Sequence, residues 1–514
     1  MNKESKQLFL NIVSSALAFL VNTGLQFVIT PIISQNIGDE AYGFITLAND
    51  FVSYASIFAV VLNSVAGRFI SIEIHKRNIE KAEEYYSSIF VGNIIISIVL
   101  SGLGLIVVGS FQNYLNVSDY LIGDVRILFS VTFANYILSV MISIFTVSTF
   151  VKNRIDINGV RNIISYLIKL LFVVILFGFS SNIKVYFLAI ATLASTVFLG
   201  VANSKISKKI MPEIRIRLTK FQPRLVLELL QTGAWMTINN LSNVLANNFT
   251  TLLININAGA SLAGFFSVAR TIPNCANSFV YAIYNVFVPT YMRLYAEEKI
   301  EELKDYSIKS MKIMAFLLSV PLIVLCIESF NFLKLWQNYR TLEEIAEMAY
   351  IMIPSLILVV LYAPVLPLSQ LGLTANKIGI QMINNIIVSV ASLLSVFIVL
   401  KNTSWGLTGI AISATVIQGL KWLFFTPVYA ATVIKMPKKV FLNENIRVVF
   451  KEIGIAILLC IINEFLCGSN WFQLIISVCV LCVVGYLIAF IILLNRHERN
   501  ILVQWVKNIF HKIK

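Results

Sequence analysis

Two stretches of this chain decide its fold: Gly38-Asp-Glu-Ala-Tyr-Gly-Phe-Ile-Thr-Leu-Ala48 and Gly259-Ala-Ser-Leu-Ala-Gly-Phe-Phe-Ser-Val-Ala269. The second stretch repeats the first 221 residues later, and both lie in a mostly apolar background. At this offset the glycines and the first phenylalanine coincide, and the match extends to Glu84-Tyr85 against Asp305-Tyr306. A repeat this long in an apolar chain predicts two similar membrane lobes that face each other across a pathway.

The composition predicts a protein that crosses a membrane many times. The 514 residues are 58% hydrophobic and 13% charged, whereas soluble proteins are roughly half apolar and a quarter charged. Apolar runs of about twenty residues, the length needed to cross a bilayer, recur from end to end. The net charge of +14 is spread over short loops between these runs, so we expect no nucleic-acid partner.

Hydropathy predicts an all-α integral membrane protein with about fourteen transmembrane helices. The expected limits are 7–34, 40–69, 86–111, 123–150, 158–179, 182–203, 225–257, 261–292, 308–330, 345–372, 376–399, 405–434, 447–467 and 471–494. The second copy of the repeat begins with the seventh span. We therefore expect two pseudo-symmetric six-helix lobes followed by two extra helices.

This pattern divides the chain into five parts. They are an N-terminal lobe, a basic linker, a C-terminal lobe, two extra helices and an amphipathic tail, at 1–204, 205–224, 225–436, 437–494 and 495–514. The tail has apolar residues on one helical face and basic residues elsewhere, which favours an interfacial helix. The linker can bind anionic lipid headgroups, or it can serve only as an orientation signal and tether, which is the favoured interpretation.

The basic residues predict the orientation of the chain. Of the 40 lysines and arginines, 28 fall in loops and ends on one side of the expected spans and four on the other. Because positive residues favour the cytoplasmic side, both termini are expected in the cytoplasm. The first apolar stretch is too long for a signal peptide and lacks a cleavage site, so it is an expected uncleaved span.

Asp50 and Arg270 are charged residues at bilayer depth, where a charge costs at least a few kcal/mol. Each lies roughly 14 Å from the outer surface at about 1.5 Å per residue. At the repeat offset Arg270 matches Asn49, the neighbour of Asp50. If the two helices face each other, Asp50 and Arg270 can pair in the empty state. Arg270 would then be free to bind an anionic group such as a diphosphate. The alternative is a structural ion pair that locks the lobes.

Two further cations belong to the expected fifth span. Arg161 opens it, and Lys169 lies eight residues later on a similar face, near the middle of the bilayer. A lysine cannot easily reach water from that depth, so a water-filled lumen is the favoured setting for Lys169. Pro273, three residues after Arg270, predicts a kink in the eighth span.

Spans one and seven are unusually rich in amides. The candidate substrate-binding amides are Asn22, Asn239, Asn240, Asn243 and Asn247. Asn22 and Asn243 coincide at the repeat offset. These side chains can line a hydrophilic cavity that accepts sugar hydroxyls, or they can join helices by hydrogen bonds; lining is favoured.

The sequence offers no catalytic, cofactor or metal site. It contains three histidines, which are far apart, and no HExxH, Walker A, GxSxG or EF-hand pattern. Without a nucleotide site, uphill transport would need coupling to H⁺ or Na⁺, or a downstream sink. No extracytoplasmic loop is long enough for a catalytic domain, which counts against membrane-bound glycosyltransferases and polymerases.

The chain resembles polysaccharide flippases of the Wzx type, within the multidrug/oligosaccharidyl-lipid/polysaccharide exporter (MOP) superfamily. The resemblance rests on both copies of the repeat, on Gly372-Leu-Thr-Ala-Asn-Lys377 and on Trp405-Gly-Leu-Thr-Gly-Ile-Ala411. It covers nearly the whole chain, although Ala263 stands where a tyrosine is expected. It implies a V-shaped, alternating-access transporter in a bacterial cytoplasmic membrane.

The resemblance also implies the substrate and the partners. The substrate would be an undecaprenyl-diphosphate-linked oligosaccharide, with its polyprenyl tail in lipid and its diphosphate near Arg270, Lys169 and Arg161. Membrane lipids, a polysaccharide polymerase and glycosyltransferases are the expected partners. The alternatives are a cation-coupled multidrug antiporter, a lipid II flippase, or a scaffold for polysaccharide assembly. The antiporter should have an acidic cavity, and Asp50 is the one deep carboxylate in the sequence.

Overall fold

The computed structural model describes the chain except residues 1–2, 181, 467–469, 497 and 501–514. Throughout the described residues the regular structure is helical, which confirms the prediction of an all-α membrane protein. Ten helices in this part are long and apolar enough to cross a membrane, and the count of fourteen stays a prediction. The amphipathic tail falls mostly outside the described residues.

The chain forms two compact units, Met1–Val268 and Ala269–Lys514, here called unit 1 and unit 2. The seventh expected span and the start of the eighth, residues 261–268, belong to unit 1. The helices of unit 1 are α1 (Lys3–His75), α2 (Ile79–Ser110), α3 (Ile122–Ser143), α4 (Val147–Val151), α5 (Ile155–Gly178), α6 (Phe187–Ile210), α7 (Pro223–Ala258) and α8 (Ala260–Ala269).

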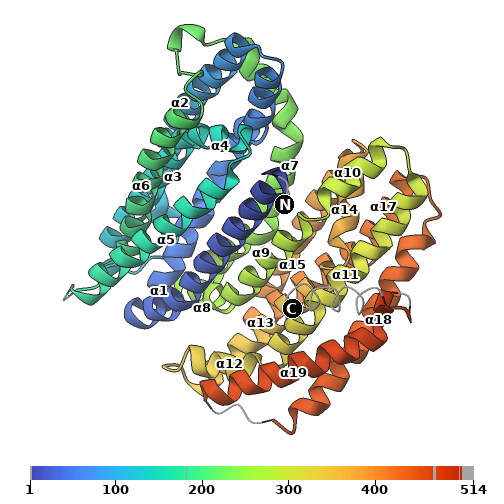
Figure 1. Cartoon of the computed structure of the whole chain (residues 1–514). Helices are drawn as coiled ribbons and strands as arrows, with labels where there is room; N and C mark the ends of the chain where they lie inside the picture. The colour runs from blue at the N-terminus through green and yellow to red at the C-terminus, as the bar shows by residue number, and fades with distance from the viewer. Residues whose placement is uncertain (1–2, 181, 467–469, 497, 501–514) are drawn as a thin grey trace. The chain divides into compact units, whose positions relative to one another are not determined.

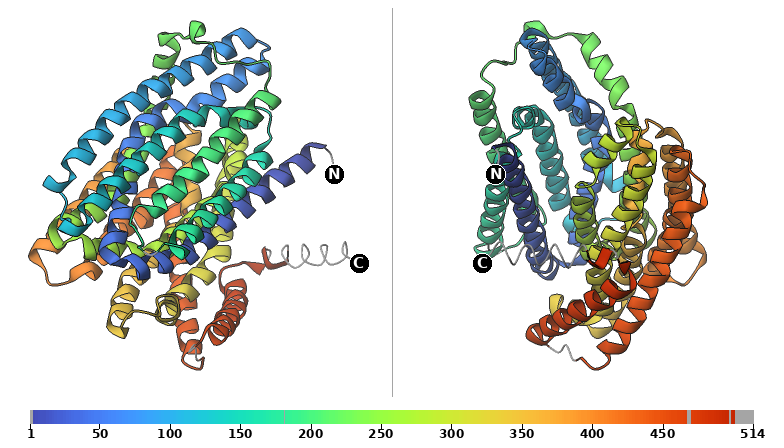
Figure 2. Two further views of the ribbon diagram at one scale, coloured as in Figure 1. Left: turned by 90° about the vertical axis from the view of Figure 1, so that its left-hand side faces the viewer. Right: turned by 45° about the vertical axis from the view of Figure 1, so that its right-hand side comes forward.

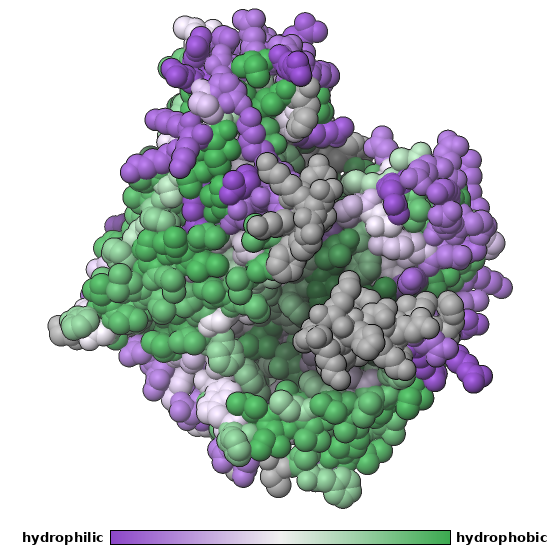
Figure 3. Space-filling view, viewed as in Figure 1, coloured by the Kyte–Doolittle hydropathy of each residue, from purple (hydrophilic) through white to green (hydrophobic). Residues whose placement is uncertain are grey.

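In unit 1, α1 packs along α7, α5 and α2, while α6 lies beside α3 and α5 (Figure 1, Figure 2). The core between these helices contains fully buried aromatic rings, among them Phe44 and Phe129. Hydrophobic side chains cover the middle of unit 1, and hydrophilic ones gather at the end where the linker meets the start of α2 (Figure 3). This distribution is the one that a bilayer requires.

The two copies of the repeat share an unusual backbone conformation. Gly38 interrupts α1 with φ 78° and ψ 168°, and Gly259 separates α7 from α8 with φ 98° and ψ 164°. This region is essentially restricted to glycine, because other residues meet steric strain there. The repeat seen in the sequence therefore corresponds to the same bend, which separates the expected first and second spans and the expected seventh and eighth spans.

The second glycines of the repeat allow two helices to touch by their backbones. A Cβ atom added to Gly264 would lie 1.8 Å from the carbonyl oxygen of Asp39, and one added to Gly43 would lie 2.6 Å from that of Ala260. Small residues allow such close packing of membrane helices. The bends at Gly38 and Gly259 thus lead directly into a close contact between the copies.

Unit 2 consists of more and shorter helices. They are α9 (Thr271–Tyr284), α10 (Val288–Ala296), α11 (Ile300–Ile327), α12 (Ser329–Trp336), α13 (Leu342–Tyr362), α14 (Leu366–Thr374), α15 (Gly379–Asn402), α16 (Gly406–Leu420), α17 (Thr426–Val433), α18 (Lys439–Asn463) and α19 (Trp471–Ile492). A π-helical turn, Lys421–Phe425, joins α16 to α17. Hydrophobic side chains cover the face of α19 (Figure 3).

Prolines explain why unit 2 is more broken than the expected spans. The predicted kink near Pro273 is present, because the helix is interrupted at Arg270. Pro273 has no N–H to donate to the carbonyl of Ala269, four residues earlier. In addition, α10, α14 and α17 each begin with a proline in the first turn, at Pro289, Pro367 and Pro427. Three spans expected to be continuous, 261–292, 345–372 and 405–434, are therefore each divided.

Candidate functional site

A polar pocket of about 90 Å³ surrounds Lys169 among the helices of unit 1. Its walls come from α1, α3, α5 and α6, and its lining residues are Ile45, Asn49, Leu128, Thr132, Asn135, Lys169, Leu188, Ala189 and Thr192. Because one water occupies about 30 Å³ of liquid, the pocket admits a few waters or one phosphate-sized group. It has no room for a sugar chain.

The polar groups around Lys169 favour an anionic guest. Among the described residues, no carboxylate lies within 4 Å of the Lys169 ammonium. The side-chain oxygen of Asn135 is buried and has no hydrogen-bond partner in the described structure. Asn49 donates its amide to the carbonyl of Ile45 at 2.8 Å, and the Thr132 side chain is buried. A lone ammonium with amides and hydroxyls can bind a phosphoryl oxygen by charge-assisted hydrogen bonds.

Arg161 lies on the same helix but does not line this pocket. Its side chain is only 4% exposed, and it donates from Nε to the carbonyl of Ile157 at 3.2 Å and from Nη2 to Asn158. Its Nη1 is buried without a hydrogen-bond partner among the described residues. It belongs to the segment of α5 that packs against α1, where Gly159 approaches the backbone of Ser14.

Asp50 is held between α1 and α7. Its carboxylate is 6% exposed and accepts a hydrogen bond from the amide of Asn248. The Tyr54 hydroxyl donates to the carbonyl of Asn248 at 3.1 Å, and its ring lies 4.5 Å from that of Phe249 between centroids. Asp50 therefore has a described partner inside unit 1. Its pairing with Arg270 stays a prediction.

Arg270 stands at the break between α8 and α9 and is half-buried. Its carbonyl accepts the N–H of Asn274 at 3.0 Å, which starts α9. A helix break in a membrane exposes backbone groups that require polar surroundings. The role of Arg270 in binding an anion stays a prediction.

The amides of spans one and seven are placed in part. Asn240 donates to the Ser56 hydroxyl at 3.3 Å, so this amide joins α7 to α1. Asn22 is half-buried on α1. The side chains of Asn239, Asn243 and Asn247 lie outside those that the structure describes. For Asn240 the observed contact is thus of the helix-joining kind, the alternative to lining.

An aromatic cluster in unit 2 did not follow from the sequence patterns. The Tyr362 ring lies near those of Tyr281 and Trp422, at 6.5 and 5.3 Å between ring centroids, and both pairs are tilted. The Lys421 ammonium lies 4.2 Å from the centroid of the Trp422 ring, a cation–π contact. The Tyr284 hydroxyl donates to Gln370 at 2.7 Å. Tyrosine and tryptophan combine an apolar face with a polar group, but isolated aromatic residues in apolar spans gave no signal of this grouping.

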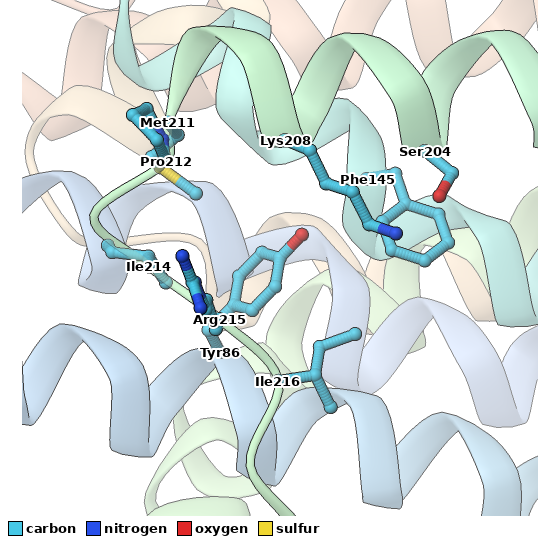
Figure 4. Close-up of a pocket in the computed structure, with 9 residues that line it drawn as sticks. All are labelled: Tyr86, Phe145, Ser204, Lys208, Met211, Pro212, Ile214, Arg215 and Ile216. Atoms are coloured by element: carbon cyan, nitrogen blue, oxygen red, sulfur yellow. The ribbon is translucent and has the colours of Figure 1, made fainter.

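A second pocket, of about 590 Å³, lies in unit 1 where α6 meets the linker (Figure 4). It is lined by Tyr86, Phe145, Ser204, Lys208, Met211, Pro212, Ile214, Arg215 and Ile216. In the described part of the chain, no group of three or more His, Cys, Asp or Glu side chains is placed to hold a metal ion.

Comparison with known proteins identifies the family of the chain. A family model described as "Polysaccharide biosynthesis protein" matches residues 8–295, more than half of the chain. The chain is similar to the uncharacterized membrane protein EpsK of Bacillus subtilis strain 168. The two are 27% identical over 437 residues, which cover 84% of this chain and 85% of EpsK.

Solved structures show the same fold at lower identity. An inward-facing multidrug resistance MATE family transporter of the MOP superfamily aligns with a TM-score of 0.70 at 14% identity, over 80% of this chain and 96% of that one. The lipid II flippase MurJ, in an inward closed conformation, aligns with a TM-score of 0.67 at 15% identity, over 93% of this chain and 98% of that one. Together these matches establish a multi-pass membrane protein with the MOP transporter fold.

Proposed function

Because the chain belongs to the polysaccharide biosynthesis protein family and has the MOP transporter fold, we propose that it is a flippase for undecaprenyl-diphosphate-linked oligosaccharide. It would move the lipid-linked sugar from the cytoplasmic to the outer leaflet of a bacterial cytoplasmic membrane by alternating access, with both termini in the cytoplasm. The product would supply cell-surface polysaccharide synthesis. Glycosyltransferases and a polymerase would act before and after it.

The observation that carries this proposal is the uncompensated Lys169 ammonium in its polar pocket. A cation inside a membrane protein costs several kcal/mol unless a partner offsets it. The described structure supplies amides and hydroxyls but no carboxylate. A phosphoryl oxygen of the substrate would provide the missing charge. The pocket volume of about 90 Å³ suits that group alone, so the sugar would have to lie elsewhere along the pathway.

The sugar and the lipid tail of the substrate would meet other surroundings than the diphosphate. Within unit 2, the aromatic faces of Tyr281, Tyr362 and Trp422 and the hydroxyls of the two tyrosines are of the kind that suits sugar rings, which present C–H faces and hydroxyl edges. The lipid tail would remain in the bilayer, where apolar surface costs nothing to expose. Coupling to H⁺ or Na⁺ would drive net export, since the sequence has no nucleotide site.

Two alternatives from the same superfamily lead to different expectations. A multidrug antiporter carries organic cations, which the Lys169 ammonium would repel, so that function is disfavoured. A lipid II flippase also carries a diphosphate, and Lys169 would serve it equally well. The sugar distinguishes these two substrates, and the pocket around Lys169 does not.

The test is a flipping assay in proteoliposomes. Fluorescent undecaprenyl-diphosphate oligosaccharide is supplied in one leaflet, and its appearance in the other is followed with a membrane-impermeant quencher. Wild-type protein should flip this lipid faster than labelled lipid II. Lys169→Gln should lower the rate at least about tenfold, the equivalent of one charge-assisted hydrogen bond, and Lys169→Arg should retain most of it.

Lys401→Gln is the matched control, because it removes a lysine that is exposed at the end of α15. It should flip at the wild-type rate. Equal rates for Lys169→Gln and the control would contradict the role of Lys169. Transport of an organic cation such as ethidium, with no flipping of either lipid, would replace the proposal by the antiporter function.

A further inference from the structure

The pocket of about 590 Å³ in unit 1 has no role in the proposed transport function. It opens where α6 ends and the linker turns back along α2, at the hydrophilic end of the unit (Figure 3). Two cations belong to its lining, Lys208 from α6 and Arg215 from the linker. Figure 4 shows their side chains on either side of the Tyr86 ring.

The linker is fixed against α2 by its own backbone. The N–H of Arg215 donates to Glu83 at 3.2 Å, that of Arg217 to Ser87 at 3.0 Å, and that of Gln222 to Ser88 at 3.0 Å. These three bonds hold the linker at successive points along the first turns of α2. The pocket is therefore largely pre-formed, which lowers the entropy cost of binding.

The carboxylates close to the pocket are already paired with other cations. Glu83 accepts from the Lys220 ammonium at 2.9 Å and lies 3.9 Å from Arg217. Glu213 pairs with Lys152 at 2.6 Å. Among the described residues, neither the Lys208 ammonium nor the Arg215 guanidinium has a carboxylate within 4 Å. Both side chains are exposed, so two positive charges remain available in the lining of one pocket.

The rest of the lining combines polar and apolar side chains. Ser204 contributes a hydroxyl, and the Tyr86 hydroxyl is within hydrogen-bond distance of Ser207 at 3.2 Å. Apolar side chains lie among these groups, namely Phe145, Met211, Pro212, Ile214 and Ile216, and Figure 4 shows the Phe145 ring beside Ser204 and Lys208. A guest that suits this lining must carry an anionic head and an apolar body.

The place of the pocket in the fold indicates more closely which ligand it binds. Helix α6, which provides Lys208, is one of the helices apolar enough to span a membrane, and it ends at Ile210. Basic residues at the end of a membrane helix meet the anionic headgroups of the adjoining leaflet. A pocket of about 590 Å³ is large enough for a glycerophosphate group and the first carbons of its acyl chains.

We propose that this pocket is a binding site for the phosphate of an anionic phospholipid, with Lys208 and Arg215 as the phosphate ligands. The glycerol and the upper acyl chains would contact Phe145, Met211 and Ile216. The bound lipid would hold the linker to the end of α6. This site is separate from the pocket around Lys169, and its existence does not depend on which substrate the protein transports.

The test measures lipid binding to the purified full-length protein in detergent. Phosphatidylglycerol is titrated and counted by native mass spectrometry, with zwitterionic phosphatidylcholine and soluble glycerol 3-phosphate as separate arms. Wild-type protein should bind one phosphatidylglycerol more tightly than it binds phosphatidylcholine. Lys208→Ala with Arg215→Ala should weaken this binding about 100-fold, since each charge-assisted contact contributes about tenfold.

The matched control is Lys209→Ala with Arg224→Ala. It removes one lysine and one arginine that are exposed nearby and do not line the pocket. The control should bind phosphatidylglycerol like the wild type. An equal loss in both double variants would overturn the proposal, because it would show general attraction between charges. Glycerol 3-phosphate binding as tight as that of the lipid would overturn the lipid as the ligand.

A second measurement uses the wild-type protein and so does not depend on how the variants fold. A phosphatidylglycerol with a photoreactive group near the headgroup is irradiated with the protein in liposomes. Crosslinks should map to the linker peptide 211–216 or to the end of α6. Crosslinks found only on other segments would refute the site.

Discussion

Substituting Gly264 by alanine tests whether the repeat is built on contact between two backbones. The added Cβ would lie 1.8 Å from the Asp39 carbonyl oxygen and 2.9 Å from the Gly43 nitrogen. Carbon–oxygen contacts normally begin near 3.3 Å, so α1 and α8 would have to separate by about 1.5 Å. The obstacle is backbone, which cannot move aside as a flexible side chain can.

The size of the effect follows from this displacement. Overpacking a filled interior costs typically about 1–3 kcal/mol and occasionally more, and here both helices would move. We expect Gly264→Ala to cost at least about 3 kcal/mol. Gly43→Ala should cost less, because its Cβ would be 2.6 Å from the nearest atom, the Ala260 carbonyl oxygen. The predicted order of stability is therefore wild type, then Gly43→Ala, then Gly264→Ala.

Thermal unfolding of the detergent-solubilised protein, followed by circular dichroism, measures this order. Gly102→Ala and Gly109→Ala are the controls, since both glycines lie in α2 and a Cβ there would meet nothing within 4 Å. Alanine is favoured over glycine in a helix by about 0.5–1 kcal/mol, so the controls should unfold at or slightly above the wild-type temperature. If Gly264→Ala unfolded with the controls, the backbone contact would not stabilise unit 1.

Three further predictions concern other parts of the chain. Gly38→Ala should lower the unfolding midpoint although nothing lies within 4 Å of the added Cβ, because φ 78° costs other residues about 1–3 kcal/mol. Ser319→Ala should lower the free energy of unfolding by about 1–3 kcal/mol, because the buried Ser319 hydroxyl donates to the buried carboxyl of Glu452. An unchanged unfolding midpoint would show that this bond is dispensable. Partial burial raises the pKa of Glu213, but the hydrogen bond and charge of Lys152 lower it by more, so the folded pKa lies below the usual 4.5. The Lys152–Glu213 pair is thus complete above pH 4.5 and is lost as the pH falls through the lower folded value. In the wild type, the rate at which an acid protease cleaves the linker should rise as the pH falls through that value. In Glu213→Gln the rate should show no such rise.

The repeat was the part of the fold that could be predicted most fully from the sequence. The repeat predicted two similar lobes, and the structure adds the physical reason for each pair of matching glycines. Gly38 and Gly259 adopt a backbone conformation reserved for glycine, whereas Gly43 and Gly264 permit close contact. Helix limits in unit 2 were predicted less well. Hydropathy is continuous across Pro289, Pro367 and Pro427, but the hydrogen-bond ladder is not.

The charged residues of the candidate site could be identified from the sequence, but the residues that surround each of them could not. Lys169 was expected in a water-filled lumen from its depth alone. The structure places it in a pocket of about 90 Å³, and its role in binding stays a prediction. Arg161 was expected on a similar face, yet eight residues at about 100° each leave it about 80° away around the helix. Asn135, Thr132 and Thr192 come from other helices, and single polar residues in apolar spans do not indicate which neighbours they will meet.

The adjacent residues Asn49 and Asp50 show why the pocket around Lys169 stays basic. Consecutive residues on a helix point about 100° apart, and so Asn49 lines the Lys169 pocket while Asp50 reaches Asn248 on α7. The deep carboxylate of unit 1 is thereby directed away from the deep ammonium, although the two helices are in contact. Had the two residues been exchanged, an aspartate in the pocket could neutralise Lys169 and no anion would be attracted. A double variant with Asn49→Asp and Asp50→Asn should therefore abolish binding of a lipid diphosphate while preserving the net charge of the chain. Unchanged binding in that variant would show that Lys169 is not the group that holds the phosphate.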